Sequence, residues 1–352
     1  MRSPEPLLRE AWPATPWPGF VRLAALVAVA LALALYAFTV AVDPFGSRVR
    51  PGSAPGPLMD LNQRYIYPQL ARSGAFDAAV FGTSTVRLLD PERLATAFGG
   101  HAANLGMNAA TPWEQTELAS LFLRHAPAPR ALVFGLDRIW CDPEAPRLTP
   151  RSFPPWLYDD DPWNDLPQLL NLRTLEIAAR VVLARAGLLR ERIRRDGYEV
   201  FTPPEARYDL ARARLNLRLI ADAPVKEGPH HPARSPALDR LDSLLAGLPG
   251  TTRLVFLLPP IHVVAQAAPG TPTAEADRAC KAQIAEMAER LGATVVDYRR
   301  ASPLTSEDAN YWDAAHYRLP IASRIVDDLA TAIRTGRGAP DGIYTIKSGR
   351  RG

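Results

Sequence analysis

The feature that most constrains this chain is a run of twenty residues without a charge, LAALVAVALALALYAFTVAV, at 23–42. A helix of that length is about 30 Å long, which matches the hydrocarbon core of a bilayer. Arg22 and Asp43 bound the run, and Tyr36 and Phe38 lie near its end, where aromatic side chains often anchor a span. The alternative is a cleaved signal peptide, whose apolar core is usually only about 7–15 residues long. The run therefore predicts an uncleaved transmembrane anchor.

The charges around the anchor give a weak indication of its orientation. Three arginines precede it, two glutamates partly balance them, and two arginines follow it. The positive-inside rule then favours a cytoplasmic segment at 1–22. We expect a single-pass protein of the inner (cytoplasmic) membrane with its soluble part in the periplasm or another extracytoplasmic space. A cytoplasmic soluble part is the alternative.

The soluble part alternates between apolar and amphipathic segments. A connector rich in Pro and Gly and a short first helix occupy 43–75. Almost wholly apolar runs, typical of parallel strands covered on both faces, follow at 78–81, 131–136, 253–258 and 293–297. Helices are expected at about 113–125, 172–194, 236–247, 273–291 and 320–335. This alternation predicts an α/β fold with a doubly wound parallel sheet over 76–336.

Three stretches depart from the alternation. Residues 138–170 are dense in Pro, Trp and Asp, and residues 197–235 are similarly irregular, so both are predicted insertions. The tryptophans of the first insertion are candidates for a carbohydrate platform, a membrane contact or simple packing. Residues 337–352 are predicted to form a flexible basic tail.

Charge and cysteine usage narrow the function classes. The net charge is +4, but acids are interleaved with the bases and no nucleic-acid module is present, so we expect no nucleic-acid partner. Cys141 and Cys280 could pair in an exported protein, and neither has the spacing of a metal site. His230 and His231 are neighbours on a Pro-rich loop and point to opposite sides, which disfavours a metal site. No cofactor is expected.

A candidate nucleophile follows the first predicted strand directly. Ser84 stands in FGTSTVR at 81–87, and YWDAAHYRLP at 311–320 places Asp313 three residues before His316. Ligands of open α/β sheets bind outside the carboxyl ends of the strands, where both segments are expected. A serine needs a base to become a nucleophile, and an imidazole needs an acceptor that fixes its tautomer. The order predicts Ser84 as nucleophile, His316 as base and Asp313 as the orienting carboxylate.

A third segment, NLGMNAATPWE at 104–114, completes the candidate site. Gly106 would let a backbone N–H approach an oxyanion, and Asn108 could add a side-chain donor. A plainer interpretation remains open, with Ser84 and Asp313 as helix caps, His316 on the surface and Gly106 in a turn.

These motifs resemble a known family. The chain is similar to SGNH-type (GDSL-like) hydrolases, in which an early serine and a late Asp-x-x-His form the site. An anchor followed by DPFG, FGTST, NLGMNAATPWE, PPIH and DAAHYR is more closely similar to membrane-anchored envelope proteins of the DltD and alginate-acetylation type. The resemblance implies a flavodoxin-like three-layer SGNH fold, with Gly106 and the Ser84 amide in the oxyanion hole.

The resemblance also implies a function and partners. We expect a serine acyl-esterase or O-acyltransferase that acts on envelope polysaccharide, beside a multispanning membrane O-acyltransferase. One departure matters, because Asp137 stands where such relatives supply an Asn, and an ionised carboxylate cannot donate to an oxyanion. Asn108 or His262 of PPIH would have to replace that donor. The departure motivates the alternative of an inactive glycan-binding or scaffolding subunit.

Overall fold

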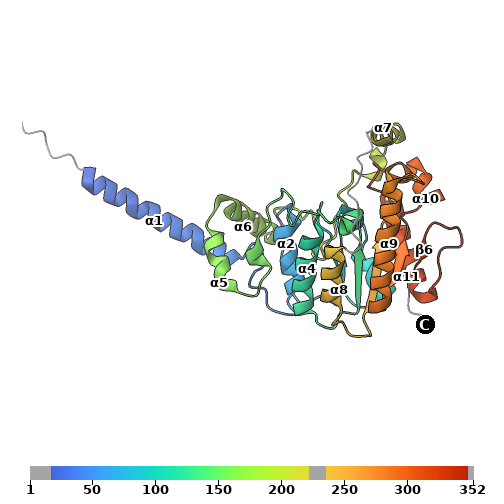
Figure 1. Ribbon diagram of the computed structural model, residues 1–352. Coiled ribbons are helices and arrows are strands. Elements are labelled where there is room, and N and C mark those ends of the chain that lie inside the picture. Colours follow the sequence, from blue (N-terminus) through green and yellow to red (C-terminus); the bar gives the residue numbers. More distant parts are fainter. Residues whose placement is uncertain (1–16, 222–234, 348–352) are drawn as a thin grey trace, which may run out of the picture.

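The computed structural model describes residues 17–221 and 235–347. Within them, a six-stranded sheet is surrounded by helices, and one long helix projects from the domain (Figure 1). The strands are β1 Ala78–Phe81, β2 Ala102–Asn104, β3 Ala131–Gly135, β4 Arg253–Leu258, β5 Thr294–Asp297 and β6 Thr345–Ile346. The longer helices are α1 Trp17–Val42, α2 Gln63–Arg72, α3 Pro91–Phe98, α4 Pro112–His125, α6 Leu172–Arg185, α7 Leu210–Ala221, α8 Pro236–Leu245, α9 Pro272–Leu291 and α11 Leu319–Thr335. The short helices α5 Pro162–Asp165 and α10 Pro303–Ser306 complete the set of α-helices in the described chain.

The sheet confirms the predicted α/β class and the four predicted strands. Its strand order is β2-β1-β3-β4-β5-β6, and β1 to β5 are parallel. The order 2-1-3-4-5 is that of flavodoxin-like doubly wound sheets. The sheet departs from the predicted parallel arrangement at one edge, where β6 pairs antiparallel with β5.

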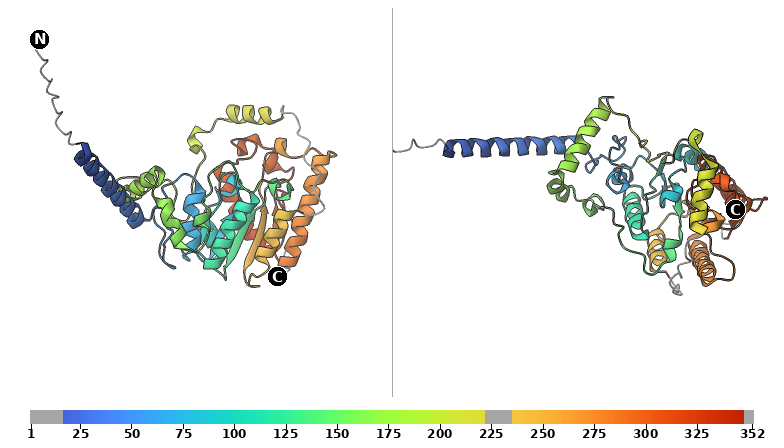
Figure 2. Two further views of the ribbon diagram at one scale, coloured as in Figure 1. Left: turned by 60° about the vertical axis from the view of Figure 1, so that its left-hand side comes forward. Right: turned by 90° about the horizontal axis from the view of Figure 1, so that it is seen from above.

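The apolar strands are covered on both faces, as their sequences require. One core lies between the sheet and α2, α4, α8 and α9, and includes Phe81, Phe134 and Phe256 from three neighbouring strands. The second core lies between the opposite face and α3 and α11, with Val80 and Val133 from the sheet. Figure 2 shows the helices on the two sides of the sheet. The domain therefore has three layers, with the strand ends free to carry loops.

The helix limits follow from local sequence signals. Thr111 and Glu114 form a capping box that begins α4, with Pro112 at its first position. The helix predicted over 172–194 is shorter and ends at Arg185, where Gly187 with φ 73° lets the chain turn away.

The C-terminal segment also differs from its prediction. The tail predicted to be flexible from residue 337 packs on the domain through Ile343 and Tyr344, which are both 2% exposed. It then adds β6 to the sheet edge. Two apolar residues inside a basic segment were the available signal. Residues 348–352 lie outside the described chain.

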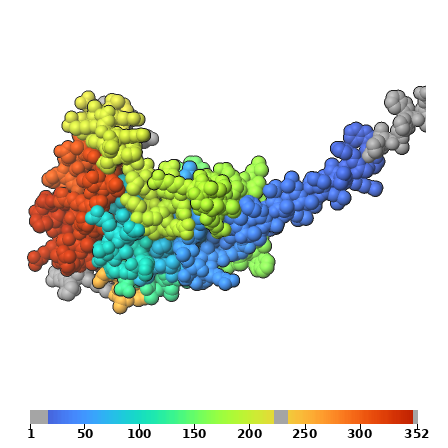
Figure 3. Space-filling model, turned by 180° about the vertical axis from the view of Figure 1, so that it is seen from behind, coloured from blue at the N-terminus to red at the C-terminus, as the bar shows by residue number. Residues whose placement is uncertain are grey.

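The N-terminal helix is longer than the uncharged run. α1 begins at Trp17, so 17–22 of the predicted cytoplasmic segment are helical. It is the one helix of the described chain that is long and apolar enough to cross a membrane. Its C-terminal end contacts the domain, where Thr39 and Val42 are buried, and the remainder projects freely (Figure 3).

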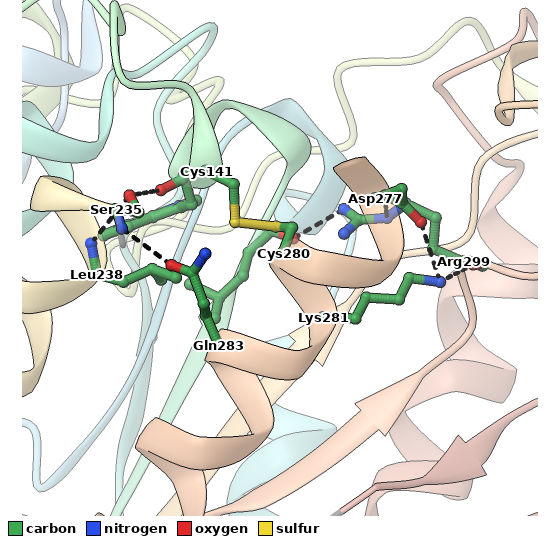
Figure 4. The surroundings of a disulfide bond; sticks show 10 residues. Cys141, Ser235, Leu238, Asp277, Cys280, Lys281, Gln283 and Arg299 are labelled. Atoms are coloured by element: carbon green, nitrogen blue, oxygen red, sulfur yellow. Dashed lines mark hydrogen bonds and ion pairs between the residues drawn. A yellow bond between two sulfur atoms is a disulfide. The ribbon is translucent and has the colours of Figure 1, made fainter. Parts of the chain in front are cut away.

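The two cysteines form a disulfide across 139 residues of sequence. Cys141 lies in the short helix η2 (Arg138–Cys141) after β3, and Cys280 lies on α9 (Figure 4). Beside it, Lys281 pairs with Asp277 at 3.4 Å and with Asp297 at 3.2 Å. The bridge therefore fixes the loop after Asp137 to the outer helix layer.

Replacing both Cys141 and Cys280 by Ser is expected to lower the free energy of unfolding by about 2–5 kcal/mol, because the long loop is no longer closed in the unfolded chain. Urea unfolding of the detergent-solubilised protein measures the change. A reductant should lower the stability of the wild type and leave the double variant unaffected. Equal midpoints for the oxidised wild type and the double variant would contradict this expectation.

Candidate active site

Ser84 lies at the carboxyl end of β1, at the start of the short helix η1 (Ser84–Val86). Gly82 makes the turn possible, because its φ is 157° and a Cβ there would approach Val86 Cγ2 to 2.6 Å. Thr83, and not Ser84, is the N-cap, since its side chain accepts a hydrogen bond from the Thr85 N–H. The capping role is thus filled by a neighbour, and the half-buried Ser84 hydroxyl serves another contact.

That contact is with His316, which stands 232 residues later in the chain. His316 Nε2 lies 2.9 Å from Ser84 Oγ, and His316 Nδ1 lies 2.8 Å from Asp313 Oδ2. A carboxylate only accepts, so Nδ1 carries the proton and Nε2 is left as the acceptor toward Ser84. The structure therefore brings the three predicted residues together in the order that a serine nucleophile requires.

A tight loop holds Asp313 and His316 in this arrangement. Tyr311 and Tyr317 pair across its base, and the Trp312 N–H donates to the His316 carbonyl at 2.8 Å. Asp313 Oδ1 also accepts from the Ala315 N–H at 2.9 Å. One carboxylate thus closes the turn and orients the imidazole.

Opposing effects act on the Asp313 carboxyl. Burial alone would raise its pKa, but the hydrogen bond and charge of His316, together with the N–H groups of Ala315 and His316, outweigh burial and lower the pKa. The carboxylate is therefore ionised at neutral pH, the state needed to stabilise an imidazolium.

His262 lies after β4, the strand beside β5, and supports this loop without contacting Ser84. Its backbone N–H donates to the Ala314 carbonyl at 2.9 Å, and its ring Nε2 lies 3.2 Å from Asp308 Oδ1. Its Nδ1 accepts from the Val264 N–H at 3.2 Å. Both ring nitrogens are engaged, so the structure places His262 as a support and not as an oxyanion donor.

Gly106 lies beside the Ser84 turn, but its N–H is already engaged. It donates to Asn104 Oδ1 at 3.0 Å, while Asn104 Nδ2 donates to the Val86 carbonyl at 2.8 Å. A Cβ at Gly106 would come within 3.0 Å of Val86 Cγ2, so the glycine allows close packing of the two segments. Close packing therefore explains the glycine at position 106 without a role in an oxyanion hole.

Asn108 is oriented by a buried ion pair. Arg87 Nη1 donates to Asn108 Oδ1 at 2.6 Å, and Arg87 Nη2 pairs with Glu199. An arginine only donates, so the Asn108 oxygen faces it and the Asn108 NH₂ remains a donor. The side chain is half-buried.

Asp137 lies behind the Ser84 turn. Thr83 Oγ1 and Thr85 Oγ1 both donate to its carboxylate, the second at 3.1 Å. Burial raises the pKa of Asp137, against the lowering effects of the Thr83 hydrogen bond and the Arg299 charge. The side chain organises the residues on either side of Ser84.

No protein-family model, no curated protein and no solved structure matches this chain.

Several residues of the site were missed by the sequence analysis. Phe201, from the second insertion, lies edge-on to the His316 ring at 5.7 Å, with the Arg87 guanidinium 4.7 Å from its centroid. The sequence marks Arg87 only as a charged residue within the mostly apolar turn VRLLD at 86–90. The Glu199 partner, 112 residues away, has no signal in the sequence.

A cleft of about 520 Å³ opens beside the candidate triad, under α7. Its lining combines cations, an aromatic ring and polar side chains, namely Pro203, Arg207, Asp209, Arg212, Ala213, Asn216, Trp312 and Asp313. In the described part of the chain, no group of His, Cys, Asp and Glu could hold a metal ion. His230 and His231 lie outside the described residues.

Proposed function

We propose that this chain is a membrane-anchored serine acyl-esterase or O-acyltransferase of SGNH type. The observation that carries the proposal is the continuous relay from Ser84 Oγ through His316 to Asp313, with distances of 2.9 and 2.8 Å. Nucleophile, base and orienting carboxylate are within hydrogen-bond reach of one another, which is the geometric signature of an activated serine.

The reaction would proceed through an acyl-enzyme. Ser84 Oγ bonds to the carbonyl carbon of an ester while His316 Nε2 takes the hydroxyl proton. The tetrahedral intermediate then expels the alcohol, which leaves with the proton from His316. In the second half, water or a glycan hydroxyl loses its proton to His316 and attacks the carbonyl carbon of the Ser84 ester. The bond from that carbon to Ser84 Oγ then breaks, Oγ regains the proton from His316, and the free acid or the acylated glycan is released.

The oxyanion donors would be the Ser84 N–H and the Asn108 NH₂. The Ser84 N–H stands at the first position of η1, where a helix leaves its N–H groups without intrahelical acceptors. Asn108 has its oxygen committed to Arg87 and keeps a donor available. Gly106 has no part in this assignment, because its N–H is donated to Asn104.

The membrane helix and the disulfide support a substrate in the cell envelope. α1 can cross a membrane, and the Cys141–Cys280 disulfide suits an oxidising compartment, which favours a periplasmic or other extracytoplasmic domain of an inner-membrane protein. The resemblance to DltD and alginate-acetylation proteins adds envelope polysaccharide as acyl acceptor and a multispanning membrane O-acyltransferase as partner.

A second candidate is an inactive SGNH-like subunit that binds glycan or supports such a complex. The specific observation in its favour is that Asp137 accepts hydrogen bonds from Thr83 and Thr85 where relatives are expected to supply an oxyanion donor. A hole that lacks one donor loses about 2.7–4 kcal/mol of transition-state stabilisation.

Labelling with a fluorophosphonate probe separates the two candidates, because only an activated serine reacts covalently. We expect the full-length protein in detergent to be labelled, with the adduct on Ser84, and Ser84→Ala to remain unlabelled. Ser243→Ala is the matched control, since Ser243 is an exposed serine on α8 whose hydroxyl donates to the Asp239 carbonyl. If the wild type is folded but is not labelled, the proposal of an enzyme is rejected in favour of the binding subunit.

A further inference from the structure

The first insertion carries apolar side chains where α1 joins the domain. α5 and the following short helix η4 (Leu166–Leu169) lie against the base of α1, and α6 contacts α1 as well (Figure 1). Between α1 and this segment runs a groove of about 540 Å³. Its lining is apolar apart from one hydroxyl and one indole N–H, and consists of Val29, Ala32, Leu33, Tyr36, Trp163, Leu166, Pro167 and Leu170.

The outer surface of this segment, which we call the 162–172 turn, carries three large apolar side chains beside the uncharged amides of Asn164, Gln168 and Asn171. Trp163 is 76% exposed, Leu170 57% and Leu172 85%. A soluble surface rarely gathers such side chains in one place without a partner.

The exposed side chains of the 162–172 turn carry no charge. The sequence PWNDLPQLLNL at 162–172 contains one ionisable residue, Asp165, which is only 2% exposed. Arg173, immediately after the turn, pairs with the buried Asp60 at 2.8 Å. Asp159 to Asp161 immediately precede the turn. Exposed Trp and Leu side chains on an uncharged surface are the kind of side chains by which peripheral segments enter the membrane interface.

The exposure of α1 shows how deep the turn would lie. Residues 17–34 are exposed throughout, a length of about 27 Å at 1.5 Å per residue, whereas from Leu35 onward the domain begins to cover the helix. That exposed length matches a hydrocarbon core of about 30 Å. Val29, Ala32 and Leu33 fall in the half of this stretch nearer to the domain.

We propose that the 162–172 turn is a second membrane contact, whose exposed side chains lie among lipid acyl chains in the leaflet on the side of the domain. The turn shares its groove with the lipid-facing surface of α1, so lipid that surrounds α1 at Val29 to Leu33 also reaches Trp163 and Leu170. Two contacts restrict rotation of the domain about α1 and hold the Ser84 edge in a fixed orientation to the bilayer. The inference is independent of the proposed reaction.

Quenching of tryptophan fluorescence by lipids with brominated acyl chains tests this contact in the full-length protein. The protein is reconstituted alone into phosphatidylcholine vesicles, and the emission of Trp163 is obtained as the difference between the wild type and Trp163→Phe. We expect brominated chains to reduce that emission by about twofold or more, as for a side chain within hydrocarbon. The matched control is Trp312→Phe, because the Trp312 carbonyl bonds Asn216 of α7, at the opposite end of the domain from α1 (Figure 1).

The possible outcomes decide between lipid, water and protein as the neighbour of the turn. Quenching of the Trp163 emission by brominated lipid, with no quenching of the Trp312 emission, supports the membrane contact. Quenching of Trp163 by aqueous acrylamide and not by lipid would place the turn in water and overturn the proposal. Quenching by neither would indicate that a second copy of the chain covers the turn, which also overturns it.

Discussion

Asp313→Asn is expected to lower the rate at which Ser84 reacts with a fluorophosphonate by about 10⁴-fold, the size of effect known for the orienting aspartate of a serine triad. Asp313 accepts from His316 Nδ1 at 2.8 Å and thereby holds the Nε2 lone pair toward Ser84. An amide can place its NH₂ against Nδ1, which favours the tautomer with the proton on Nε2. That tautomer cannot take the hydroxyl proton.

Asp308→Asn is the matched control for this variant. Asp308 belongs to the same region and also contacts a histidine ring, but that ring is His262, which does not reach Ser84. The rate of labelling should therefore stay within a small factor of the wild-type rate. Thermal unfolding of both variants establishes that each is folded. Equal rates for Asp313→Asn and the wild type would mean that Ser84 reacts without this relay.

The relay could be predicted from the sequence because a parallel sheet collects its functional loops at one edge. Ser84 follows β1 directly, and the Asp313–His316 loop follows β5, so recognition of two apolar strands was enough to bring them to the same side. The strands themselves were visible because both of their faces are buried. β2 was missed because its three residues, Ala102–Asn104, form no apolar run.

The support around the relay could not be predicted in the same way. The Gly106 N–H was expected to face an oxyanion, but the Asn104 side chain two residues earlier takes it, and glycine spacing alone does not show such competition. The Arg87–Glu199 pair joins the first strand end to the second insertion. Contacts of this kind depend on how loops pack in three dimensions, and no periodicity marks them.

A second buried ion pair joins Arg64 on α2 to Glu114 on α4, and the loss of one partner is expected to destabilise the surroundings of the site strongly. Both side chains are fully buried, with Arg64 Nε to Glu114 Oε1 at 2.9 Å and Nη2 to Oε2 at 2.6 Å. Arg64 Nη1 also donates to the Asn108 carbonyl at 3.2 Å, and Glu114 accepts from the Thr111 N–H at 2.9 Å. The pair thus links two helices to the segment that carries Asn108.

Arg64→Ala should lower the free energy of unfolding by about 3–5 kcal/mol, because it leaves the Glu114 charge buried without its partner. With an unfolding entropy of about 0.7 kcal/mol/K for a chain of 352 residues, the melting temperature should fall by roughly 4–7 °C. Arg93→Ala removes an exposed arginine that pairs with Asp327 at 2.8 Å and serves as the control, with an expected loss of at most about 1 kcal/mol. Differential scanning calorimetry of the detergent-solubilised protein measures both.

The double variant Arg64→Ala/Glu114→Ala distinguishes a lost charge partner from a lost side-chain volume. If the cost of Arg64→Ala comes from the unpaired carboxylate, removal of Glu114 as well relieves it, and the double variant loses less than the sum of the single losses. Loss of packing alone would make the two costs additive. Because the Asn108 carbonyl bonds the same guanidinium, Arg64→Ala should also slow the labelling of Ser84 at a temperature where the variant is still folded. Additive stability costs with unchanged labelling would show that the pair neither depends on its charge nor positions Asn108.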